Sequence, residues 1–87
     1  MSVYNISVNR IMNGFVRAAR AAGVTSLDEE TIFAARAEAA RAAKDPGYIA
    51  RRRNIGPYPQ TMGAHAAFHD KFFALHREIG ADVFSRI

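Results

Sequence analysis

The sequence predicts an all-α fold, a small bundle of three main helices with a short basic helix inserted before the last one and a proline-rich connector. Three observations predict it: apolar residues recur at helical spacing near the start, an alanine-rich stretch fills the middle, and strong helix start and stop signals separate the segments. A chain of 87 residues is too short for two independent cores. We therefore expect one helical domain spanning residues 1–87.

The first element is expected to begin near Val8. Residues 1–7 contain β-branched and aromatic side chains in weak alternation, which predicts an extended arm, with an early helical turn as the alternative. Gly23 is well placed to end the helix in a left-handed turn. The apolar arc that predicts this amphipathic helix consists of Val8, Ile11, Met12, Phe15, Ala18, Ala19 and Ala22.

A second helix is expected to start at Ser26, because Ser26 and Glu29 have the spacing of a capping box. It should run to about Lys44, through alanine-rich sequence that favours helix and allows close approach to neighbouring helices. Its charges are nearly balanced, since two arginines can pair with two glutamates: Arg36 and Arg41 with Glu29 and Glu38.

The third element is a short basic helix over residues 48–53. Asp45 is expected to cap it, with Pro46 at its first position. Residues 54–60 should form an ordered connector of extended character, because the Gly-Pro-Tyr-Pro sequence within them cannot continue a helix.

The last helix is expected to start near Thr61 and to run to Ile79, with Gly80 as its cap and residues 81–87 as a further turn or tail. Much of the apolar content is alanine, which buries little area. We therefore expect phenylalanines to supply most of the hydrophobic stabilisation: Phe15, Phe33, Phe68, Phe72 and Phe73.

The composition argues against several functional classes. The chain has no cysteine, which excludes disulfides, thiolate metal sites and a cysteine nucleophile and favours a reducing compartment. It shows no signal-like start and no long apolar run, so we expect a cytoplasmic protein without membrane insertion. No glycine-rich phosphate loop or nucleophile elbow is present, so the sequence predicts neither an enzyme nor a cofactor.

Arginine is the most informative residue type for function. The formal net charge is +4, and 10 of the 12 basic residues are arginine, which engages carboxylate and phosphate groups through two contacts at once. The sequence therefore predicts an accessory, inhibitory or assembly protein that docks on a larger partner protein with an acidic surface, with nucleic acid as the alternative partner. The predicted contact residues are Tyr48, Arg51, Arg52, Arg53 and Tyr58 around the third helix, and Arg10, Arg17 and Arg20 on the first.

The last helix also carries a stripe of three histidines. His65 and His69 are one turn apart and are able to grip one metal ion together, whereas His76 lies about 10 Å farther along the axis, too far to join them. A metal site is therefore one alternative. The stripe can instead face the core or a partner, including a second copy of the chain, or it can make association sensitive to pH.

Overall fold

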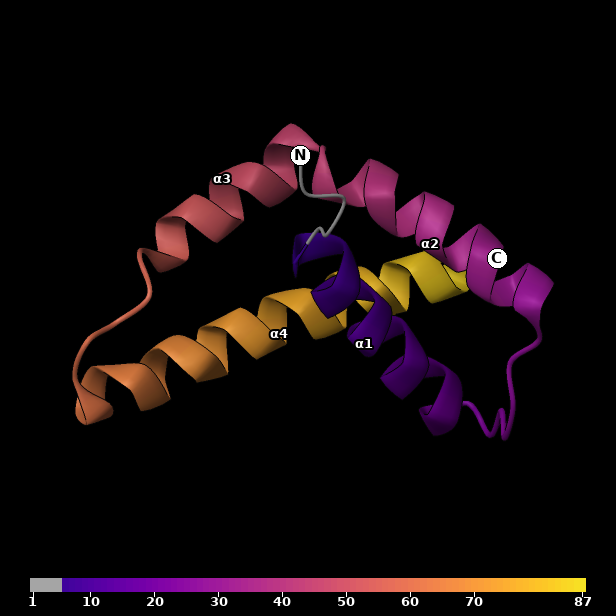
Figure 1. Cartoon of the computed structure of the whole chain (residues 1–87), viewed down its shortest axis with the longest axis horizontal. Helices are drawn as coiled ribbons and strands as arrows, with labels where there is room; N and C mark the ends of the chain where they lie inside the picture. Colours follow the sequence, from indigo (N-terminus) through magenta and orange to yellow (C-terminus); the bar gives the residue numbers. More distant parts are fainter. Residues whose placement is uncertain (1–5) are drawn as a thin grey trace.

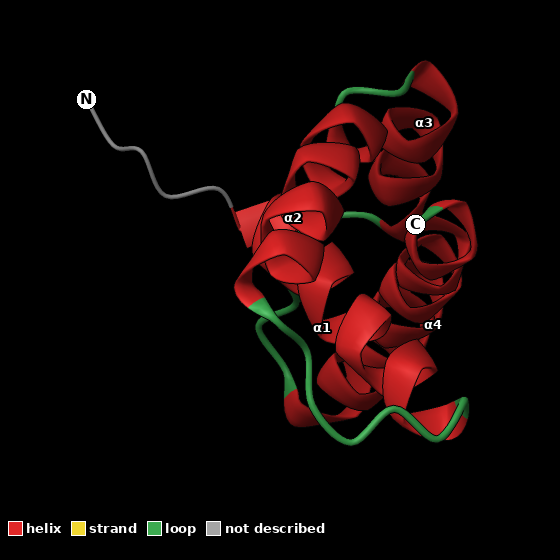
Figure 2. Cartoon of the chain, turned by 90° about the vertical axis from the view of Figure 1, so that its right-hand side faces the viewer, coloured by secondary structure: helices red, strands yellow, loops and turns green. Residues whose placement is uncertain are grey.

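The computed structural model describes residues 6–87, which form four α-helices and no strand. Helix α4 (Met62–Arg86) runs along the long axis, and α1 (Ile6–Ala21) crosses it, while α2 (Glu29–Ala43) and α3 (Pro46–Ile55) form an arch over the pair (Figure 1). Figure 2 shows the helices joined only by loops. The all-α prediction is confirmed, and none of the described helices is long and apolar enough to span a membrane.

Helix α1 begins earlier than the sequence predicts. Ile6 and Ser7 are already helical, so the extended arm predicted over residues 1–7 is wrong for these two positions. Residues 1–5 of that predicted arm lie outside the described residues. Most of the predicted arc is buried, whereas Ala18 is half-buried and Ala22, beyond the end of the helix, is exposed. Gly23 follows with a φ of 88°, a left-handed conformation that glycine adopts without steric cost.

Helix α2 is capped by Asp28, not by Ser26. The Asp28 carboxylate accepts a hydrogen bond from the Thr31 backbone N–H at 2.7 Å. Hydrogen bonding by Thr31, through its side chain first and then through this amide, lowers the pKa of Asp28. The capping-box prediction was therefore wrong by two residues, because Asp28 caps the helix through the Thr31 amide and the helix begins only at Glu29. The predicted end at Lys44 is confirmed, and Ala35 and Ala39 are fully buried.

Helix α3 begins as expected. Asp45 caps it by accepting hydrogen bonds from the backbone N–H groups of Gly47 and Tyr48, at 3.0 and 3.2 Å, and Pro46 is its first residue. The helix continues two residues beyond the predicted end, to Ile55. Gly56 then ends it with a φ of 92°.

Helix α4 passes through Gly80 and continues to Arg86, so the predicted cap at Gly80 was wrong. Gly80 lies where α4 crosses α1, and a Cβ at this position would lie 2.6 Å from the Cα of Gly14 and overlap the backbone around it. A Cβ at Gly14 would lie 3.0 Å from the Cα of Arg77. The two glycines therefore allow direct backbone contact between α1 and α4.

The core lies between α1 and α4 and is closed by α2 and α3. Its largest fully buried side chains are Phe15, Ile11 and Val83. Two of the phenylalanines predicted to stabilise the core do not lie inside it, since Phe33 is 78% exposed and Phe73 39% exposed. The small side chains of Ala35 and Ala39 take the place that Phe33 was expected to fill on α2.

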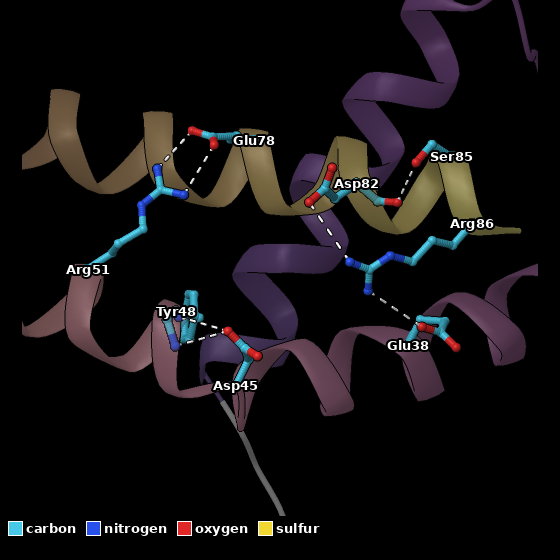
Figure 3. A network of polar contacts seen from close by, with 9 residues as sticks. Glu38, Asp45, Tyr48, Arg51, Glu78, Asp82, Ser85 and Arg86 are labelled. Atoms are coloured by element: carbon cyan, nitrogen blue, oxygen red, sulfur yellow. Dashed lines mark hydrogen bonds and ion pairs between the residues drawn. The ribbon is translucent and has the colours of Figure 1, made fainter.

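Arg86, at the end of α4, forms one surface ion pair with α2 and another within α4. Arg86 lies 3.9 Å from Glu38 and 4.0 Å from Asp82 (Figure 3). Glu38 also pairs with Arg41, as the sequence predicted, whereas Arg36 donates to the side-chain oxygen of Asn9 instead of a glutamate. These exposed contacts leave the excess positive charge on other elements.

Candidate functional site

The three consecutive arginines of α3 have three different environments. The Arg51 guanidinium donates two hydrogen bonds to the Glu78 carboxylate of α4, at 2.8 and 3.1 Å (Figure 3). This pair lowers the pKa of Glu78 and raises the pKa of Arg51. Arg51 thus already has an acidic partner within the protein.

Arg52 is directed inward. Its guanidinium lies 4.9 Å from the ring centroid of Phe72 and 5.8 Å from that of Phe68, and it donates a hydrogen bond to the carbonyl of Gly56 at 3.2 Å. These contacts hold the end of α3 and the start of the connector against α4. Within the described residues, only Arg53 of the three is exposed without a side-chain partner.

Tyr48, predicted to contact a partner, is buried. Its hydroxyl lies 2.7 Å from Nε2 of His76, while Nδ1 of His76 lies 2.7 Å from the carbonyl oxygen of Phe72. A carbonyl only accepts, so Nδ1 carries the proton and Nε2 accepts from Tyr48. Burial lowers the pKa of His76, and the charges of Arg52 and Arg10 lower it further, against the bond to Phe72. The prediction of Tyr48 as a surface contact was wrong.

The other two histidines lie near the start of α4, away from His76. Nε2 of His65 is 3.1 Å from Nε2 of His69 and 2.5 Å from the hydroxyl of Tyr58. Tyr58 is 62% exposed and packs edge-on against Phe68, with ring centroids 5.4 Å apart. Across residues 6–87, no group of three or more histidine, cysteine, aspartate or glutamate side chains is arranged to hold a metal ion.

A strongly basic groove lies between α1 and α4, and we call it the arginine groove. It has a volume of about 860 Å³ and runs beside the Gly14–Gly80 crossing. Helix α1 supplies three of its arginines and α4 supplies a fourth, and the groove contains one carboxylate. Its lining consists of Arg10, Asn13, Gly14, Val16, Arg17, Arg20, Asp70, Phe73, His76 and Arg77.

The arginines of the groove differ in their burial and in whether their guanidinium groups contact other side chains. Arg10 is half-buried, with its guanidinium 5.5 Å and 5.7 Å from the ring centroids of Phe72 and Phe73. In the part of the chain that the structure describes, Arg17, Arg20 and Arg77 are exposed, and their guanidinium groups have no ion-pair or hydrogen-bond partner. The groove therefore presents three unpaired positive charges beside one that is fixed on aromatic rings.

The sequence reasoning identified Arg10, Arg17 and Arg20 as one face but missed Arg77. The sequence does contain a pattern that indicates Arg77, because Arg17 follows Gly14 by three residues and Arg77 precedes Gly80 by three. Residues three apart share one side of a helix, so a glycine-mediated crossing brings these two arginines to the same groove.

No family model, curated protein or solved structure shows significant similarity to this chain. The proposal for its function therefore depends on the geometry and chemistry of the molecule itself.

Proposed function

We propose that this is a small non-enzymatic docking protein that binds a larger protein by taking an acidic segment of that partner into the arginine groove. The observation that supports this proposal is the lining of the groove, where four guanidinium groups accompany a single carboxylate. Unpaired guanidinium groups that converge on one surface attract carboxylates, and each is able to engage a carboxylate through two parallel hydrogen bonds.

The lining also favours a protein partner over nucleic acid. Phe73, which is 39% exposed, and Val16 add apolar surface beside the charges, and Asn13 adds an amide. Protein interfaces combine arginine with aromatic and aliphatic contacts in this way. Nucleic-acid binding in a sequence-independent mode instead uses rows of charge with aromatic rings free to stack on bases, and Phe73 already stacks on His69, with ring centroids 5.1 Å apart.

The groove is formed before any partner binds. Its two walls are α1 and α4, which touch through their backbones at Gly14 and Gly80 and cannot move together any further. A preformed groove lowers the conformational entropy that is lost on binding. The proposed contact residues are therefore Arg17, Arg20 and Arg77, with Arg10 as a fixed neighbour.

The experiment compares two double charge reversals of equal size. In the groove variant, Arg20→Glu is combined with Arg77→Glu. In the control, Arg53→Glu is combined with Lys71→Glu, two exposed cations that lie outside the groove and have no ion-pair partner among residues 6–87. Each protein is used to capture partners from the native host, with and without nuclease, after circular dichroism has verified equal helix content.

We expect the wild-type protein and the control to retain the same protein partner, and the groove variant to lose it. Capture that survives in the groove variant but not in the control would overturn the proposal and place the interface around Arg53 of α3 and Lys71 of α4. Capture that nuclease abolishes, with a steep dependence on salt, would identify nucleic acid as the partner instead.

A further inference from the structure

Near the start of α4, outside the arginine groove, two potential metal-binding atoms lie within hydrogen-bond distance of a third, Nε2 of His65. Nε2 of His65 lies 3.1 Å from Nε2 of His69 and 2.5 Å from the phenol oxygen of Tyr58. We propose that Tyr58, His65 and His69 bind a divalent first-row transition-metal ion of the zinc and copper class. The site has two imidazole nitrogens and one phenol oxygen as its protein ligands.

The local fold explains why these three side chains meet. His65 and His69 are one turn apart on α4 and therefore share a face. Tyr58 comes from the connector, where Pro57 and Pro59 restrict the backbone on either side of it. Its ring packs edge-on against Phe68 and His65, with centroid distances of 5.4 and 5.1 Å, which directs the hydroxyl at the histidine pair.

Hydrogen bonding alone does not satisfy this arrangement well. Nε2 of an imidazole has either one lone pair or one N–H, so it forms one good hydrogen bond. Nε2 of His65 nevertheless faces both the Tyr58 hydroxyl and Nε2 of His69. Whichever tautomer His65 adopts, its Nε2 offers a single lone pair or a single N–H, so only one of the two contacts is a good hydrogen bond. A metal ion accepts a lone pair from all three atoms at once.

The spacing of the donors fits such an ion. Two ligands bound tetrahedrally at about 2.0 Å lie about 3.3 Å apart, close to the 3.1 Å between the two histidine nitrogens. The phenol oxygen, at 2.5 Å from His65, has to move outward by less than about 1 Å to reach the same spacing. Tyr58 is free to make that movement, since its side chain is 62% exposed and belongs to a connector.

The surroundings of the histidines orient them. His69 stacks on Phe73 with centroids 5.1 Å apart and meets Phe68 edge-on at 5.9 Å, so apolar rings fix its plane. Three protein ligands leave one position of a tetrahedral ion open. Because Tyr58 is exposed, water is able to complete the coordination from the solvent side. Imidazole nitrogen with phenol oxygen is a donor set that suits Zn²⁺ and Cu²⁺.

The test titrates Zn²⁺ into the full chain, free of any affinity tag, by isothermal calorimetry. We expect one ion per chain, and an affinity at least about tenfold lower in His65→Ala, His69→Ala and Tyr58→Phe. Tyr58→Phe retains the ring that packs on Phe68 and removes only the oxygen. Glu30→Gln, which removes an exposed carboxylate on α2 outside both this site and the arginine groove, should bind as the wild type does.

A second measurement reports on the tyrosine directly. Cu²⁺ bound to a phenolate shows a visible charge-transfer absorption band, which we expect in the wild-type protein and not in Tyr58→Phe. Absence of Zn²⁺ binding by the wild-type chain would overturn the proposal. Unchanged Zn²⁺ affinity in Tyr58→Phe would also overturn it, by reducing the site to an ordinary pair of histidines one turn apart.

Discussion

The protein has two arginine-rich regions, and they differ in what their charges contact. On α3, Arg51 pairs with Glu78, and Arg52 lies on the rings of Phe68 and Phe72. In the arginine groove, Arg17, Arg20 and Arg77 have no such partner among the described residues. Two of the three adjacent arginines of α3 are therefore occupied by contacts within the protein, whereas these three groove arginines are free to bind another molecule.

Helix geometry explains this difference. Consecutive residues of a helix point about 100° apart, so Arg51, Arg52 and Arg53 diverge to a neighbouring helix, to the core edge and to solvent. Arg17 and Arg20 are three residues apart and share one side of α1. Closeness in sequence is thus a poor guide to a common binding surface on a helix, whereas helical spacing together with the crossing of two helices is a better one.

The largest effect is expected at the crossing that forms the groove. In Gly80→Ala, the new methyl group would overlap the backbone of α1 around Gly14, which no side-chain rotation relieves. We expect the free energy of unfolding to fall by about 3 kcal/mol or more, because α1 and α4 must separate along much of the core. Urea unfolding monitored by circular dichroism measures this change, and partner binding should fall with it.

Gly63→Ala is the matched control. It lies in the same helix with nothing within 4 Å of the new methyl group, so it should be neutral or stabilise the protein by up to about 1 kcal/mol. If Gly80→Ala proved as mild as Gly63→Ala, the close crossing, and with it the preformed groove, would be refuted.

The sequence was sufficient for the all-α class and for the elements with strong local signals. The apolar face of α1 and the Asp45-Pro46 start of α3 depend on neighbours along the chain, and both were predicted. Gly80 was misread as a helix end because a capping glycine and a crossing glycine look alike locally. Only contact with Gly14, 66 positions earlier in the sequence, distinguishes them.

The candidate site was predictable only in part for the same reason. Arg10, Arg17 and Arg20 belong to one helix, and their shared face follows from spacing. Arg77 joins them through tertiary contact. Tyr48 was misassigned because an exposed and a buried tyrosine give the same local pattern, and its partner His76 is 28 residues away.

A further effect is expected at Tyr48, the buried tyrosine of α3. Tyr48→Phe removes the hydroxyl that donates to Nε2 of His76 and leaves that buried nitrogen without a partner. We expect a loss of about 1–3 kcal/mol in the free energy of unfolding, with partner capture unchanged. Tyr58→Phe, measured without added metal, should change stability by less than about 0.5 kcal/mol, because Tyr58 is 62% exposed. Unchanged stability with lost capture in Tyr48→Phe would return this tyrosine to a docking role.

The smallest effect is expected at His76, which lies between the α3 region and the arginine groove. The positive charges of Arg52 and Arg10 both act on it. Its pKa in the folded protein is lowered, chiefly by burial, below the ordinary value of about 6.5. As the pH falls below 6.5, the His76 imidazole is protonated in the unfolded chain but stays neutral in the folded protein. The contribution of His76 to the free energy of unfolding is therefore fully present above pH 6.5. It is lost as the pH falls toward the lower folded pKa, by at most about 1.4 kcal/mol per pH unit.

Denaturant unfolding between pH 7.5 and pH 5, an interval chosen to bracket about 6.5, measures this decline. His76→Gln should be less stable than the wild type at neutral pH but should lose less stability on acidification, because its side chain does not titrate. His65 and His69 are present in both proteins, so the difference between the two slopes belongs to His76 alone. Equal slopes would show that His76 takes up its proton as readily in the folded protein as in the unfolded chain. In that case burial beside Tyr48 would not keep His76 neutral in the folded protein.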